Sequence, residues 1–166
     1  ILKKRKGIIK FLQSLVLINV LWISTAGVVC AEEVRPAGYH EYVTTEDEAI
    51  AHWYGIERGA YLRDGICTIK RMGTAKMGFS GTTTANAICD KVKVGIYLNE
   101  SSNGGSSYGT IASYYFSEEN TTSCHGSKPD VSVTSGWYYY ASAGHSVTKG
   151  STTEMMNTNT DAIKAS

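Results

Sequence analysis

Proline and cysteine are scarce in this 166-residue chain, which contains two prolines and four cysteines. So little proline excludes a proline-rich linker protein, and so few cysteines exclude a small disulfide-dense scaffold. Charged residues make up only 19% of the chain, against about 25% in average soluble proteins. The length supplies about one ordinary domain, which excludes a large multidomain enzyme.

Glycine, tyrosine, serine and threonine take the place of the missing charges, and this composition favours β-strands over helices. From residue 59 onward, short β-branched and aromatic runs are separated by Gly, Asn and Ser clusters. The rhythm predicts an all-β fold, an antiparallel β-sandwich of about seven strands, Ig-like or jelly-roll-like. The expected strands are Tyr61–Met72, Lys76–Thr84, Asp90–Glu100, Gly109–Glu118, Asp130–Thr134, Trp137–Val147 and Thr152–Asn159.

The clearest expected strand is Lys91–Asn99, in which polar and aliphatic residues alternate. Aliphatic side chains from Val92 to Leu98 share one face, because successive side chains of a strand point to opposite sides. One face therefore belongs to the core and the other to solvent. Residues 100–108 are rich in Ser and Gly, and they are expected to form a hairpin loop between two antiparallel strands.

Residues 1–31 have the organisation of a signal peptide. Five basic residues precede the apolar stretch Phe11–Ile23, which is shorter than the roughly 20 residues needed to span a bilayer. Small residues follow, and cleavage is expected after Ala31. Two alternatives are lipidation of Cys30, which the β-branched residue before it disfavours, and an uncleaved anchor over Ile8–Val29. All three predict export, so the protein is expected to be secreted or retained at the cell surface.

Removal of the leader changes the charge balance of the chain. Five of the sixteen basic residues leave with it and all fifteen acidic ones remain, which gives the mature chain a net charge of −4. A surface with this charge lacks the basic stripe that nucleic acid requires. It is equally unsuited to docking on anionic lipid. We therefore expect neither a nucleic-acid partner nor a membrane once the signal peptide is cleaved.

The polar segment of residues 32–58 is expected to be an acidic arm that precedes a β-sandwich domain of residues 59–166. Thr45 and Glu48 have the spacing of a capping box, which predicts two turns of helix from Glu46 to about Tyr54, ended by Gly55. His, Trp and Tyr are indifferent helix formers. An irregular arm laid against the domain is the alternative.

Three cysteines remain when Cys30 leaves with the leader, so they cannot all pair within one chain. A bridge between Cys67 and Cys89 would close a loop of about 20 residues and add on the order of 3 kcal/mol. The alternative is that they are reduced, buried and act as small apolar residues. The sequence leaves both open.

Cys124 and His125 suggest a thiolate nucleophile and its base. Adjacent side chains on an extended chain point in opposite directions, however, and no peptidase motif surrounds the pair. The four histidines are scattered and show no metal-ligand spacing. We expect neither a metal nor another cofactor.

The aromatic run Trp137–Tyr140 is the most suggestive feature for ligand binding. In a strand, Tyr138 and Tyr140 would share one face and could present a recognition surface together with Tyr97 of another strand. Exposed aromatic faces suit a glycan or a protein. In the alternative, neighbouring side chains cover both faces of the run.

Several short segments between residues 59 and 163 form a shared pattern: Thr82–Asn86, Cys89–Val92, Trp137–Tyr140, His145–Val147 with Lys149 and Gly150, and Thr152–Glu154. Together they resemble a family of small secreted proteins of unknown function from Gram-positive bacteria. The resemblance covers about residues 59–163 and implies an exported β-rich domain, with no established activity or catalytic residue to carry over.

These observations lead to one main hypothesis and two alternatives. The main hypothesis is a secreted or cell-surface, non-enzymatic binding module whose extracellular ligand is a glycan or a protein. The first alternative is a secreted antagonistic protein of the bacteriocin type. The second is a cysteine-dependent hydrolase.

Overall fold

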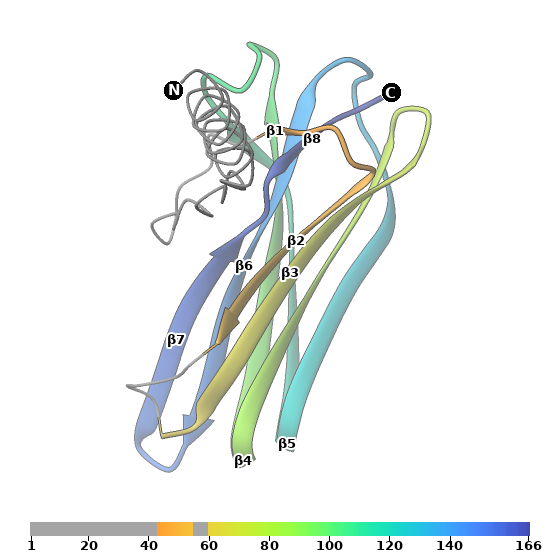
Figure 1. Cartoon of the computed structure of the whole chain (residues 1–166). Helices are drawn as coiled ribbons and strands as arrows, with labels where there is room; N and C mark the ends of the chain where they lie inside the picture. The colour runs from red at the N-terminus through yellow and green to blue at the C-terminus, as the bar shows by residue number, and fades with distance from the viewer. Residues whose placement is uncertain (1–42, 55–59) are drawn as a thin grey trace, which may run out of the picture. The chain divides into compact units, whose positions relative to one another are not determined.

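The computed structural model describes residues 43–54 and 60–166, and its regular elements are all strands. The prediction of an all-β fold is therefore confirmed (Figure 1). Within the described residues, no helix is long and apolar enough to cross a membrane. The strands are β1 (Val43–Thr44), β2 (Glu48–Tyr54), β3 (Leu62–Gly73), β4 (Lys76–Ser101), β5 (Gly109–Ser132), β6 (Tyr138–Lys149), β7 (Thr152–Asn159) and β8 (Ala162–Lys164).

Strand β4 organises the sheet because it changes partner part-way along one of its edges. On that edge, residues 76–85 pair with β3 and residues 91–101 pair with β6. Strand β5 follows the other edge through both parts. The sheet thus has two parts: a first layer that contains β2, β3 and the first half of β4, and a second layer that contains the second half of β4 with β6, β7 and β8.

The two layers pack face to face, and Gly81 of β4 lies at one of the close contacts between them. A Cβ atom at Gly81 would lie 2.8 Å from side-chain carbons of Val94 and Ile96, which belong to the other half of the same strand. Strand β4 therefore turns back over itself. The aliphatic face expected from Val92 to Leu98 is buried between the layers, as the alternation predicted.

The pairing differs from the predicted antiparallel sandwich of seven strands. The described residues form eight strands, and β1 runs parallel to β8, with Val43 opposite Ala162, so the sheet is mixed. Two pairs of expected strands are also single long strands, β4 and β5. The apparent breaks are register shifts, such as the one between Thr84 and Cys89, and pairing resumes beyond them.

The expected helix from Glu46 to about Tyr54 is wrong, since Glu48–Tyr54 is strand β2. Its residues pair antiparallel with β3, from Glu48 opposite Lys70 to Tyr54 opposite Asp64. The ladder with β3 satisfies the backbone groups that a helix would have satisfied internally. The predicted signal peptide, residues 1–31, and the start of the arm lie outside the described residues.

A carboxylate joins the end of one layer to the other. Glu154 of β7 accepts hydrogen bonds from the backbone N–H groups of Ala60 and Leu62, both at 2.7 Å, and of Tyr61 at 3.1 Å. Burial acts to raise the pKa of Glu154, but these donors outweigh it and hold the pKa below its ordinary value. Glu154 therefore fixes the start of β3 against β7.

We expect Gly81→Ala to lower the free energy of unfolding by about 1–3 kcal/mol, because its methyl group would overlap Val94 and Ile96. Urea unfolding measures the change. The control is Gly109→Ala, where a Cβ meets nothing within 4 Å and the change should stay within about 0.5 kcal/mol. Equal stability of the two variants would contradict close packing at Gly81.

Candidate functional site

The outer face of the second layer carries amide, hydroxyl and tyrosine side chains in regular rows. The rows follow from the strand register, which places one residue from each strand opposite its neighbours. One consequence is that Tyr97 and Tyr140, which lie far apart in the sequence, share one face. The rows are Thr110–Asn99–Tyr140, Ser113–Tyr97–Ser142–Asn159 and Tyr115–Gly95–Gly144–Asn157.

Residues of these rows line a cavity of about 440 Å³, which we call the tyrosine groove. Its lining comes from four neighbouring strands and contains no charged side chain. Amide and hydroxyl groups supply both donors and acceptors of hydrogen bonds. The lining residues are Tyr97, Asn99, Thr110, Tyr140, Ser142, Ala143, Gly144, Asn157 and Asn159.

Hydrogen bonds hold the floor of the tyrosine groove in a fixed arrangement. Asn99 is buried, its Nδ2 donates to Ser142 Oγ at 3.1 Å, and its Oδ1 accepts from Thr110 Oγ1 at 2.6 Å. The Asn99 amide is thus hydrogen-bonded on both sides. It ties β4 to β5 and β6 beneath the groove.

Each tyrosine of the groove packs edge to face against a second tyrosine. The ring centroids are 5.8 Å apart for Tyr97 and Tyr115, and 4.8 Å apart for Tyr140 and Tyr108. Such pairs hold the rings in defined orientations. A hydrogen bond with Tyr115, together with burial, raises the pKa of Tyr97, and burial raises the pKa of Tyr140. Both phenols therefore stay uncharged at neutral pH.

The structure brings two of the three tyrosines predicted from the sequence into this groove. Tyr97 and Tyr140 line it, whereas Tyr138 lies one row further along, with its ring 5.6 Å from Lys164 Nζ. Sequence reasoning missed Asn157 and Asn159 of β7. Their spacing of two within an expected strand was the available signal, because it places both amides on one face.

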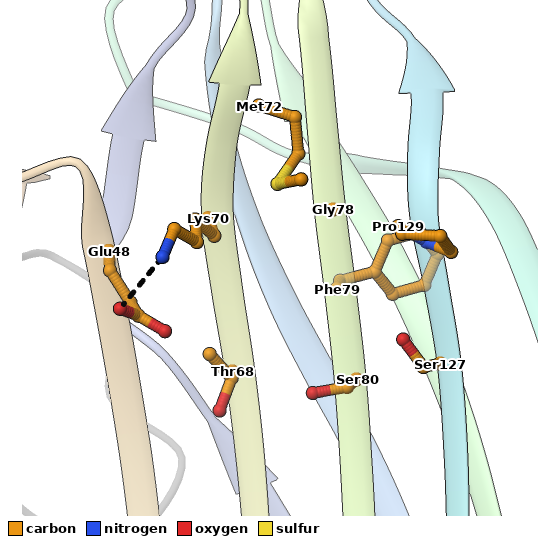
Figure 2. A pocket seen from close by; sticks show the side chains of 9 residues that line it. All are labelled: Glu48, Thr68, Lys70, Met72, Gly78, Phe79, Ser80, Ser127 and Pro129. Atoms are coloured by element: carbon orange, nitrogen blue, oxygen red, sulfur yellow. Dashed lines mark ion pairs between the residues drawn. The ribbon is translucent and has the colours of Figure 1, made fainter.

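A second, smaller cavity of about 160 Å³ lies over strands β2 to β5 of the first layer. Figure 2 shows the ion pair between Glu48 of β2 and Lys70 of β3, and Ser80 and Ser127 on the next two strands. The distance between Glu48 Oε2 and Lys70 Nζ is 3.6 Å. The two charges compensate each other. The size and uncharged lining of the tyrosine groove make it the stronger candidate for a ligand site.

Cys67, Cys89 and Cys124 are buried, free cysteines in the structure. Cys67 lies opposite Gly81 in the β3–β4 ladder, and no bond joins it to Cys89, with which the sequence suggested a bridge. Burial raises the pKa of Cys67 to about 12, which keeps its thiol protonated.

Cys124 and His125 point to opposite sides of β5. Cys124 is buried between the layers, whereas His125 is exposed and its Nδ1 lies 2.9 Å from Thr82 Oγ1. Burial raises the pKa of the Cys124 thiol. The hypothesised nucleophile and base are therefore not in contact.

His145 lies between the layers, only 1% exposed, in a chain of hydrogen bonds. Thr83 Oγ1 donates to the Lys93 carbonyl at 2.8 Å, so its oxygen can accept from His145 Nδ1–H at 2.9 Å. His145 Nε2 is then left to accept from the Thr158 hydroxyl, at 2.8 Å. The hydrogen-bond partners thus assign a neutral tautomer.

Burial lowers the pKa of His145 to about 4, and attraction to Asp64 opposes this shift only in part. The ring also packs on Gly65, where a Cβ would lie 2.6 Å from His145 Cδ2. His145 is therefore an internal structural residue. Across residues 43–54 and 60–166, no three His, Cys, Asp or Glu side chains are grouped to hold a metal ion.

Comparison with known proteins identifies the family of this chain. A family model matches residues 28–163. The chain belongs to DUF6147, a family of unknown function. The DUF6147 match extends further toward the amino terminus than the segments that carried the sequence resemblance, and it includes β2.

No curated protein matches this DUF6147 chain. Among solved structures, it is similar to AggA, the major subunit of aggregative adherence fimbriae type I from Escherichia coli. The two are 14% identical, and the alignment covers 77% of this chain and 99% of AggA with a TM-score of 0.32. A likeness at this level assigns no function to the DUF6147 chain.

His145 is expected to make the protein less stable in mild acid. Its folded-state pKa of about 4 lies below the ordinary 6.5, so the unfolded chain binds the proton more tightly. The stabilisation that results from this difference in pKa is complete above pH 6.5 and is lost as the pH falls toward 4. Between pH 7 and pH 4.5 we expect a loss of about 2–3 kcal/mol from this residue, measured by urea unfolding.

The variant His145→Gln should show a smaller loss of stability over this pH range than the unmodified protein. His125→Gln is the matched control, because that side chain is exposed. If His145→Gln does not fold, an NMR titration of His145 in the unmodified protein gives its pKa directly. A value near 6.5 would show that the ring is not buried as described.

Proposed function

We propose that this member of DUF6147 is a non-enzymatic, extracellular binding module that holds its ligand in the tyrosine groove. The observation that carries the proposal is the meeting of Tyr97 and Tyr140 around one cavity, from strands that are neighbours only in the folded protein. A concave site with a few fixed polar groups is the usual form of a ligand site. Asn99, hydrogen-bonded on both sides, supplies such a fixed group.

The positions of the reactive side chains support binding without catalysis. A cysteine hydrolase needs a thiolate within reach of a base and of substrate. Cys67, Cys89 and Cys124 are all at most 1% exposed, and burial raises the pKa of each thiol. Buried, protonated thiols favour a structural role for the three residues.

An extracellular site of action is part of the proposal and rests on residues 1–31, whose basic and apolar segments are typical of a signal peptide. The net charge of −4 expected after cleavage supports neither a nucleic-acid partner nor electrostatic attachment to a membrane. The ligand is then an extracellular molecule.

We expect Tyr97→Ala to weaken ligand binding by at least fivefold, because it removes one wall of the tyrosine groove. The probe is an array that presents oligosaccharides beside fibronectin and collagen, and the full chain is applied to it. Tyr54→Ala is the matched control, since Tyr54 is 60% exposed on the first layer, away from the groove.

Urea unfolding of both variants separates lost binding from lost folding. Failure of the unmodified chain to bind any array component would contradict the proposal. So would binding that Tyr97→Ala and Tyr54→Ala reduce equally while both variants remain folded.

A further inference from the structure

The chemistry of the tyrosine groove restricts the class of ligand that fits it. None of its lining residues is charged, and their polar groups are amides, hydroxyls and phenols. A charged ligand would lose hydration here without gaining an opposite charge. A ligand with many neutral donors and acceptors could replace its bonds to water by bonds to the groove.

Asn157 and Asn159 are the side chains best placed to make such bonds. Both lie on the outer face of β7, and neither side chain is hydrogen-bonded to another described residue. Each amide offers two donors and one acceptor. Adjacent hydroxyls on a sugar ring present the complementary set, because every hydroxyl both donates and accepts.

The tyrosine pairs supply the apolar part of the site. The ring of Tyr97 borders the cavity, and its partner Tyr115 is 72% exposed in the next row. The face of an aromatic ring carries partial negative charge and attracts the polarised C–H groups that line one side of a pyranose. A sugar ring could thus place its C–H side on a tyrosine while its hydroxyls reach the amides.

Two glycines allow the side chains of the groove to lie close to the sheet: a Cβ at Gly95 would lie 3.1 Å from Tyr115 Cδ1 and from the Tyr97 hydroxyl, and a Cβ at Gly144 would lie 3.4 Å from Asn157 Oδ1. Gly95 and Gly144 are directly opposite each other on β4 and β6, in the row that ends at Asn157. Successive rows on one face of a sheet lie about 7 Å apart, and the lining extends along β6 from Tyr140 to Gly144, which is longer than one sugar ring. This length suits a short chain of sugars.

We infer that the ligand of the tyrosine groove is an uncharged oligosaccharide of pyranose rings. The inference rests on the function proposed above and adds the ligand class. Tyr97 and Tyr140 border the sugar rings, and Asn157 and Asn159 bind their hydroxyls. Asn99 keeps the floor in position from below.

Isothermal titration calorimetry tests this inference with the full chain. The neutral probes are cellotetraose, tetra-N-acetylchitotetraose and mannotetraose, and tetragalacturonate is the charged comparison. We expect at least one neutral probe to bind and tetragalacturonate to bind at least tenfold more weakly. Tyr97→Phe should retain most of the affinity because the ring remains, whereas Tyr97→Ala should lose it.

The amides provide the matched pair of variants. Asn157→Ala should weaken binding of the neutral probe by about fivefold to tenfold, through loss of a hydrogen bond to a hydroxyl. Asn86→Ala, at an exposed position on the bend of β4, should leave binding unchanged.

The possible failures of the two proposals are distinct. If no neutral sugar binds but a protein on the array binds in a Tyr97-dependent way, the oligosaccharide inference is overturned and the binding function stands. Preference for tetragalacturonate would overturn the inference in the same way. If nothing binds through Tyr97, both fall.

Discussion

The exchange of β3 for β6 along one edge of β4 is the constraint on which the rest of the structure depends. A single 26-residue strand contributes to both layers, and its two halves face each other across the core. This arrangement requires a small residue where the two halves of β4 meet, which Gly81 provides. It also requires that one face of each half be apolar, as the alternation from Val92 to Leu98 makes it.

The candidate site is a product of the same exchange. Because β6 takes the place of β3 beside the second half of β4, Asn99 lies opposite Tyr140 and Tyr97 lies opposite Ser142. The inward faces of these strands hold the layers together, so their outward faces are free to carry polar and aromatic groups. The buried hydrogen bonds of His145 hold β6 against β4 and β7 from the inside, beneath the row that contains Gly95 and Gly144.

Single strands and their loops could be predicted from the sequence, whereas the pairing between strands could not. Alternation in Lys91–Asn99 and the Ser–Gly loop after it identified a strand and its hairpin, because both signals lie within a few residues. The sequence did not reveal that β4 continues past residues 85–88, because a register shift interrupts the alternation of polar and apolar residues in the same way as a loop. In β2 the alternation of Ala49, Ala51 and Trp53 competed with a capping-box spacing, and pairing with β3 decided the outcome. The groove needed the register of four strands, which no local pattern contains.

The parallel pairing of β1 with β8 joins the two extremes of the described chain. Pairing of segments distant in the sequence has a larger loop-closure entropy cost than pairing of neighbours, and such contacts slow folding. Strand β8 lies beside β6, at the end where Tyr138 and Tyr139 face Lys164 and Ile163. A nascent chain therefore cannot complete this sheet until β8 has been synthesised, and until then one edge of β6 stays open at that end.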